Sequence, residues 1–169
     1  RALDLSIDKE RFVREVLMGG QAPARSLVPP AIREPTGYVP ADGPSFDPDA
    51  AKALLAEYVR DRGAPPRFSY LYNSGEAHRL IAEYLQAEWR KHLGLDVSVE
   101  AVEWKTLLER LRKGDFQAAR ATWCADFVDP VNYLEVFRSG GPNDYPAFAD
   151  PAFDAAVDAA QRAGTWPER

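Results

Sequence analysis

The fold class of this chain is decided by residues 67–102, RFSYLYNSGEAHRLIAEYLQAEWRKHLGLDVSVEAV. Residues 67–72 are rich in aromatic side chains and residues 95–102 alternate apolar with polar ones, so both predict strands. Residues 76–93 repeat apolar side chains at helical spacing, which predicts a helix between the strands. A strand, a helix and a strand in this order form a βαβ unit with parallel strands and a right-handed crossover. The sequence therefore predicts an α/β fold.

The sequence before this unit predicts helices on either side of a long irregular segment. Residues 1–18 are predicted to be helical in two pieces, and Asp8 can cap the second piece. Residues 19–48 are rich in proline and glycine, which predicts irregular structure. Their apolar side chains indicate that this segment packs on the domain as an extended strap rather than hanging free. Asp47 followed by proline is typical of a helix start, so another helix is predicted to begin there.

The sequence after the unit continues to alternate helices with strands. In chain order it predicts a helix, a strand and then further helices, over residues 105–113, 116–122, 132–138 and 152–163. Gly114 is predicted to end the first of these helices. This alternation indicates an α/β core that extends to the end of the chain.

Composition narrows the possible classes of protein. The chain has 169 residues, of which 46% are hydrophobic and 28% are charged, as in an ordinary globular domain. The net charge is −5 and no basic stripe stands out, so we expect no nucleic-acid partner. The single cysteine, Cys124, excludes an intramolecular disulfide and a zinc site built from cysteines. No run of 18 apolar residues is present, so no membrane-spanning helix is predicted.

The common motifs of catalytic and cofactor sites are absent. The sequence contains no GxGxxG, no P-loop, no HExxH and no GxSxG motif. His78 and His92 lie on one predicted helix, about 21 Å apart along its axis, which is too far to share a metal ion. Cys124 with His78 lacks a third orienting group for nucleophilic catalysis. We therefore expect no enzymatic activity, no metal and no cofactor.

A ligand site is predicted where the strands end. In open α/β sheets, ligands bind beyond the carboxyl ends of the strands, and aromatic walls with a few polar groups are typical of such clefts. The candidate residues at these ends are Asn73, His78, Trp104, Arg120, Trp123, Cys124, Ala125 and Asp126. Structural roles remain open for them. The tryptophans could be core residues, the asparagine and aspartate turn formers, the histidine a solvated helix-start residue, and the arginine half of a structural pair.

Four stretches in chain order resemble the oligopeptide-binding proteins that serve ABC-type importers. They are RALDLSIDKERFVREVLMGGQAPARSLVPP at residues 1–30, LYNSGEAHRLIAEYLQAEWRKHLGLDVSVEAVEWKTLLERLRKGDF at 71–116, WCADFVDPVNYL at 123–134 and DPAFDAAVDAAQR at 150–162. The resemblance implies one lobe of a two-lobed periplasmic-binding-protein type II fold, with a mixed sheet flanked by helices. Residues 1–169 would then be a partial C-terminal ligand-binding lobe, with a helix at 1–18, a proline-rich strap at 19–48 and an α/β core at 49–169. The first lobe and the C-terminal strands would lie outside this sequence.

The resemblance also implies a function and a role for each candidate residue. The protein would be the periplasmic or otherwise extracytoplasmic component of an ABC importer, a monomer that binds extended oligopeptides and meets a membrane permease. Its signal sequence would lie outside residues 1–169. Asp126 would meet the α-ammonium of the peptide. The main chain of Trp123, Cys124 and Ala125 would pair with the peptide backbone. Trp104 and Trp123 would wall side-chain pockets, Asn73 would lie near the cleft, and His78 and Arg120 would face a peptide carboxylate.

One departure from the family and three competing functions remain. The family position that carries a further basic residue aligns with Leu111, so the preferred peptide length stays open. A peptide-sensing receptor or a chaperone-like module would share this sequence, because only the partner differs. A carboxylate-dependent hydrolase would use Asp126 with Asp129, but Pro130 indicates that Asp129 is a turn residue.

Overall fold

The computed structural model describes residues 1–41 and 43–165. Its contacts divide the chain into two compact units, which are described separately. The first unit consists of Arg1–Arg25, Pro44–Glu109 and Phe116–Ala121, and the second consists of Ser26–Gly43, Arg110–Asp115 and Thr122–Arg169. Within the described residues, no helix combines the length and apolar character that a membrane crossing requires.

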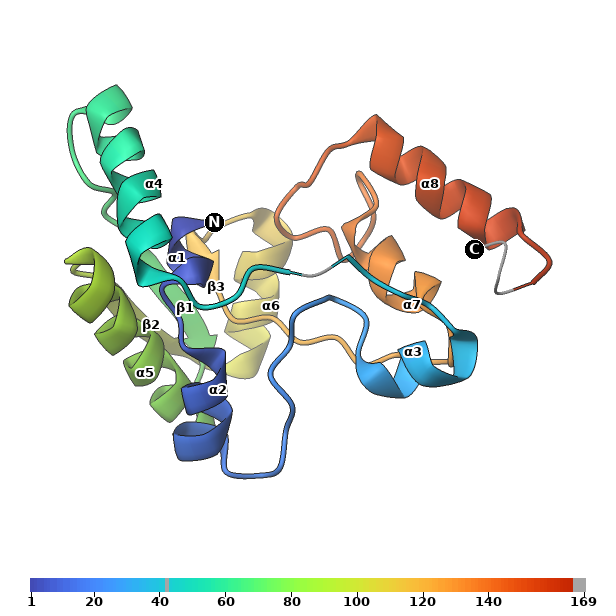
Figure 1. The fold of residues 1–169 in the computed structure, drawn as a ribbon, viewed down its shortest axis with the longest axis horizontal. Helices are drawn as coiled ribbons and strands as arrows, with labels where there is room; N and C mark the ends of the chain where they lie inside the picture. The colour runs from blue at the N-terminus through green and yellow to red at the C-terminus, as the bar shows by residue number, and fades with distance from the viewer. Residues whose placement is uncertain (42, 166–169) are drawn as a thin grey trace. The chain divides into compact units, whose positions relative to one another are not determined.

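The first unit is built on a small parallel sheet (Figure 1). Strand β1 (Ser69–Asn73) lies at the centre, between β2 (Ser98–Val102) and β3 (Ala118–Ala119). Helix α5 (Glu76–Leu93) connects β1 to β2, so the predicted βαβ unit is confirmed. Both strand pairings among the described residues are parallel. The resemblance implies a mixed sheet, but no antiparallel strand is present among the described residues.

The apolar face of α5 forms the core of this unit. Ala82 and Trp89 of α5 are buried against Tyr70 and Tyr72 of β1. The Trp89 ring meets Tyr70 edge-on, with ring centroids 6.0 Å apart. Gly94 ends the helix in a left-handed conformation with φ of 65°, which glycine adopts without a steric penalty. The carboxyl end of β1 at Asn73 comes directly before the start of α5 at Glu76 in the chain.

The N-terminal residues are helical in short pieces, as predicted. Helix α1 (Ala2–Leu5) is followed by α2 (Lys9–Phe12), which continues as a π-helical turn at Val13–Leu17. The Asp8 carboxylate accepts a hydrogen bond from the Arg11 N–H at 2.9 Å, so the predicted cap is confirmed. The next helix is α4 (Pro48–Arg62), and Asp47 caps it in the same way.

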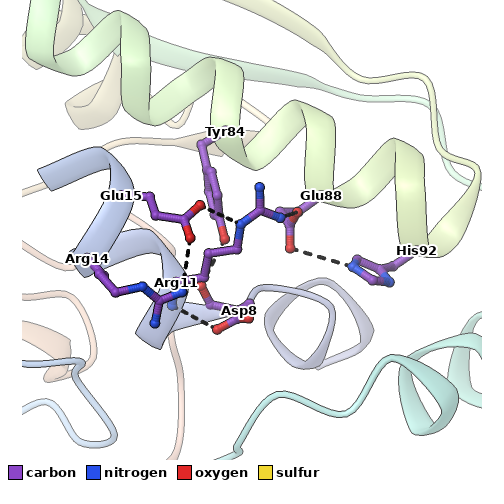
Figure 2. A network of polar contacts seen from close by, with 7 residues as sticks. All are labelled: Asp8, Arg11, Arg14, Glu15, Tyr84, Glu88 and His92. Carbon is purple, nitrogen blue, oxygen red and sulfur yellow. Dashed lines mark hydrogen bonds and ion pairs between the residues drawn. The ribbon is translucent and has the colours of Figure 1, made fainter.

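Polar contacts tie these N-terminal pieces to α5 (Figure 2). The Tyr84 hydroxyl donates to the Asp8 carbonyl at 2.9 Å. The buried Glu88 carboxylate lies 3.6 Å from the Arg11 guanidinium and 3.6 Å from the His92 imidazole. Arg11 also pairs with Glu15 at 2.7 Å. Burial, reinforced by the Glu88 charge, raises the pKa of Tyr84 to about 12.

Two segments differ from the prediction. The strap is not irregular throughout, because it contains helix α3 (Pro30–Thr36), which Gly37 ends. Proline is tolerated in the first turn of a helix, where its missing N–H has no intrahelical partner. Strand β3 is limited to two residues instead of the predicted residues 116–122, because its ladder reaches only the middle of β1.

The remaining helices are close to the predicted ranges. Helix α6 (Trp104–Lys113) follows β2. In the second unit, α7 (Val131–Leu134) continues as the 3₁₀ turn η2 (Glu135–Phe137), and α8 (Pro151–Arg162) lies further along the chain. Val131 of α7 packs with Val157 and Ala160 of α8 in a small core of their own.

Candidate functional site

The predicted site residues fall into two groups, one in each unit. The first unit contains Asn73, His78, Trp104 and Arg120, and the second contains the loop of residues 123–126. Each group is held by hydrogen bonds within its own unit.

Asn73 is the centre of the first group. It is the last residue of β1, and Arg120 follows β3 on the neighbouring strand. Because parallel strands end at the same edge of a sheet, the two side chains meet there, and Arg120 Nη1 donates to Asn73 Oδ1 at 3.0 Å. His78 Nδ1 lies 3.1 Å from the Asn73 carbonyl oxygen. The structure therefore brings together three of the predicted residues.

The Arg120 charge has a neutral partner. Arg120 is partly buried, and its side chain donates to the amide oxygen of Asn73 rather than to a carboxylate. Its backbone N–H donates to the Leu71 carbonyl at 2.8 Å, which fixes the start of the side chain. Burial raises the pKa of Tyr70 nearby, while the positive charge of Arg120 opposes that rise. A half-buried guanidinium bound to an amide keeps donors and charge for an anionic ligand group.

Trp104 lies at the start of α6 and is 48% exposed. The core role left open for it from the sequence is therefore wrong. The indole stands directly after the carboxyl end of β2. This is where an aromatic side chain can form one wall of a ligand site.

The second group is a loop tied to one buried asparagine. Trp123 Nε1 donates to Asn132 Oδ1 at 3.1 Å, and the backbone N–H of Asp126 donates to the same oxygen at 3.2 Å. Asn132 lies in α7 and is 1% exposed. Trp123 is thus held by its indole N–H and is only partly buried, which separates it from a core tryptophan.

The Asp126 carboxylate takes no part in this anchoring. Asp126 is exposed, and its contact with Asn132 uses the main-chain N–H rather than the carboxylate. A turn former would use its carboxylate to bind nearby N–H groups, so that alternative has no hydrogen bond to support it among the described residues. Ala125 is partly buried, and Cys124 is exposed with a free thiol. The loop therefore presents a carboxylate on a fixed backbone.

Asp129 has the structural role expected from the sequence. It is buried, and its carboxylate accepts a hydrogen bond from the Val131 N–H at 2.9 Å. This engagement argues against a pair of catalytic carboxylates made by Asp126 and Asp129. Within the part of the chain that the structure describes, no group of three or more histidine, cysteine or acidic residues could hold a metal ion.

Sequence reasoning missed Asn132. The signal was the position of Asn132 between Val131 and Leu134 in one helix. Both of these apolar residues pack in the core. A polar residue between core positions needs a buried partner. The sequence could not identify that partner as the loop of residues 123–126.

Comparisons with known proteins identify the family of this chain. A model of the family described as "Bacterial extracellular solute-binding proteins, family 5 Middle" matches residues 1–145. The oligopeptide-binding protein OppA of Bacillus subtilis (strain 168) is 33% identical over 172 residues, covering 95% of this chain and 31% of OppA. The probable deoxycholate-binding periplasmic protein YgiS of Escherichia coli (strain K12) is 33% identical over 163 residues, covering 95% of this chain and 30% of YgiS.

A solved structure shows the same fold. The crystal structure of Haemophilus influenzae OppA in complex with RPPGFSPFR superposes with a TM-score of 0.89 at 29% identity, covering 99% of this chain and 34% of that one. The chain thus spans about a third of the length of the curated relatives and of this structure.

Proposed function

Because this chain belongs to the bacterial extracellular solute-binding proteins of family 5, we propose that it is part of a protein that binds oligopeptides in extended form. The observation that carries the proposal is the loop of residues 123–126. The Trp123 indole and the Asp126 backbone N–H both bind Asn132, while the Asp126 carboxylate stays exposed. A fixed backbone beside a free carboxylate suits the amino-terminal end of a peptide.

At that end, Asp126 would form a charge-assisted hydrogen bond with the α-ammonium group of the ligand. The main chain of Trp123, Cys124 and Ala125 would pair with the peptide backbone, as an added strand does. Main-chain pairing does not read side chains, so it supports binding of many sequences. Trp104, which is half exposed, would provide an aromatic wall for a ligand side chain.

The first unit offers a group that suits a carboxylate of the ligand. Arg120 and His78 both contact Asn73, and the guanidinium has a neutral amide as its side-chain partner. Arg120 can therefore donate further hydrogen bonds to a carboxylate, for which its planar geometry is suited. The group around Arg120 therefore suits the carboxyl terminus of a peptide.

The biological setting follows from the family and its relatives. We propose an extracytoplasmic, monomeric protein that passes its ligand to an ABC-type permease, without a cofactor and without catalysis. The relatives are named as binding proteins, and YgiS is named as periplasmic. A sensing role would use the same site and would differ only in the partner.

The similarity to YgiS raises a second ligand class, because deoxycholate has a carboxylate but no ammonium group. Arg120 could bind the carboxylate of either ligand, whereas the Asp126 carboxylate could form an ion pair only with a ligand that has an ammonium group. The exposed, unengaged Asp126 carboxylate therefore favours peptides over bile acids.

The test uses the complete protein that contains this chain. Calorimetry would compare a peptide with free termini, the same peptide with an acetylated amino terminus, and deoxycholate. We expect micromolar or tighter binding of the free peptide and at least a hundredfold weaker binding of the acetylated one. Equal binding of the two peptides, or preferential binding of deoxycholate, would overturn the proposal.

A further inference from the structure

We propose that Asn132 is a positioning residue, which holds the loop of residues 123–126 in its binding conformation before any ligand arrives. The inference rests on the proposed function, because the loop conformation matters to binding only if the loop of residues 123–126 meets a ligand. Asn132 itself would touch no ligand. It would act through the backbone of the loop and through the ring of Trp123.

One oxygen atom of Asn132 binds both Trp123 and Asp126, and we call this pair of hydrogen bonds the clamp. Asn132 Oδ1 accepts the indole N–H of Trp123 at 3.1 Å and the backbone N–H of Asp126 at 3.2 Å. A carbonyl oxygen has two lone pairs, and both are used here. The two donors lie at the two ends of the loop, so one acceptor fixes the loop between them.

The acceptor belongs to the core rather than to the loop. Asn132 is 1% exposed, and its backbone N–H donates to the Asp129 carbonyl at 3.1 Å. Its neighbour Val131 packs against Val157 of α8, and the Asp129 carboxylate caps the Val131 N–H. The position of the Oδ1 atom is therefore set by helix packing. Its two hydrogen bonds then restrain the loop of residues 123–126.

The clamp also decides which groups remain for a ligand. The Asp126 N–H is occupied by Asn132, so Asp126 can offer a ligand only its carboxylate and its carbonyl. The Trp123 N–H is occupied as well, so the indole can offer only its apolar surface. Removing the clamp would release two donors and let the loop sample conformations that do not bind.

The expected loss follows from the fraction of molecules with a competent loop. Apparent affinity falls in proportion to that fraction. A loop that has lost two partly buried hydrogen bonds should be competent in about one molecule in ten to one in a hundred, given the usual cost of orphaned donors. We therefore expect Asn132→Leu, which keeps the volume but removes the acceptor, to weaken peptide binding about ten- to a hundredfold.

The experiment measures peptide affinity by calorimetry for the complete protein and its variants. Asn132→Asp keeps an acceptor oxygen at the same place and should restore binding to within about threefold of the wild type. Trp123→Phe removes one donor, keeps an aromatic ring, and should lose less than Asn132→Leu. In an Asp126→Ala background, Asn132→Leu should lose less affinity than it does in the wild type, because coupled residues are non-additive.

A second measurement, amide hydrogen exchange of the ligand-free protein, does not depend on peptide binding. The Asp126 amide should exchange slowly in the wild type and much faster in Asn132→Leu or, if that variant does not fold, in Trp123→Phe. Slow exchange in these variants, or full affinity in Asn132→Leu while Asp126→Ala loses binding, would overturn the positioning role alone. Failure of the wild-type protein to bind any peptide would instead overturn the proposed function.

Discussion

Replacing Asp126 by alanine should remove most of the affinity for peptides with a free amino terminus while leaving the fold intact. In the proposed complex, the ligand ammonium would lie beside Asp126 and out of contact with water. Removing one partner of a buried ion pair costs about 3–5 kcal/mol, because the other charge stays buried without compensation. That cost corresponds to a loss of about two to four decades in affinity.

The effect on stability should be small, for a reason visible in the structure. Asp126 is exposed, and it contributes its backbone N–H rather than its carboxylate to the hydrogen bond with Asn132. Alanine keeps that N–H, so the free energy of unfolding should change by less than about 0.5 kcal/mol, as for most surface substitutions.

Calorimetry for affinity and thermal unfolding for stability would test both statements on the complete protein. Asp49→Ala is a matched control, because it removes a carboxylate that is 91% exposed, from the first turn of α4. It should leave peptide affinity unchanged. N-acetylated peptides should bind the wild type weakly and lose little more in Asp126→Ala. An Asp126→Ala protein with a lower melting temperature and unchanged peptide affinity would refute the reasoning and make Asp126 a turn residue.

Three further predictions concern the first unit. Leu71 lies in the central strand and is 1% exposed. Leu71→Ala should therefore lower the free energy of unfolding, measured in urea, by about 2–5 kcal/mol. A loss below about 1 kcal/mol would contradict the packing described. The pKa of Tyr84 is raised to about 12, so its contribution to stability should be complete below pH 10 and be lost as the pH rises through 12. Because Tyr84 is partly exposed, that step should be below about 1 kcal/mol, and it should be absent from the alkaline unfolding curve of Tyr84→Phe. Asn73→Asp should pair the Arg120 guanidinium with a carboxylate and weaken binding of peptides with a free carboxyl terminus about tenfold. Carboxyl-amidated peptides are the control. Equal effects on both kinds of peptide would exclude a carboxylate site at Arg120.

The elements that could be predicted from the sequence are those whose signals are local. Helix α5 has the predicted bounds because its apolar spacing continues until Gly94, which adopts the left-handed conformation that ends it. The caps at Asp8 and Asp47 were predictable for the same reason, since a capping side chain binds an N–H three residues ahead. Helix α3 was missed because the prolines of this segment suggest irregular structure, although proline is tolerated at the first helical position, where Pro30 lies.

The parts that could not be predicted depend on contacts between distant residues. Strand β3 was predicted too long because its pairing is limited by its register with β1, which the sequence of β3 does not contain. Asn73 and Arg120 could be expected at one edge of the sheet, but their direct hydrogen bond depends on that same register. Asn132 was missed because its partners, Trp123 and Asp126, are chosen by the path of a loop rather than by periodicity.

The two asparagines of the candidate site solve one physical problem in the same way. A charged side chain that must bind a ligand has to be held in place without being neutralised. A carboxylate beside Arg120 would hold the guanidinium but would compete with a ligand carboxylate for its charge. The Asn73 amide holds it at 3.0 Å and leaves the net charge uncompensated. Asn132 likewise fixes Asp126 through the backbone N–H and leaves the carboxylate unengaged. In each unit, a neutral acceptor therefore positions a charged group while keeping it available for a ligand group of opposite charge.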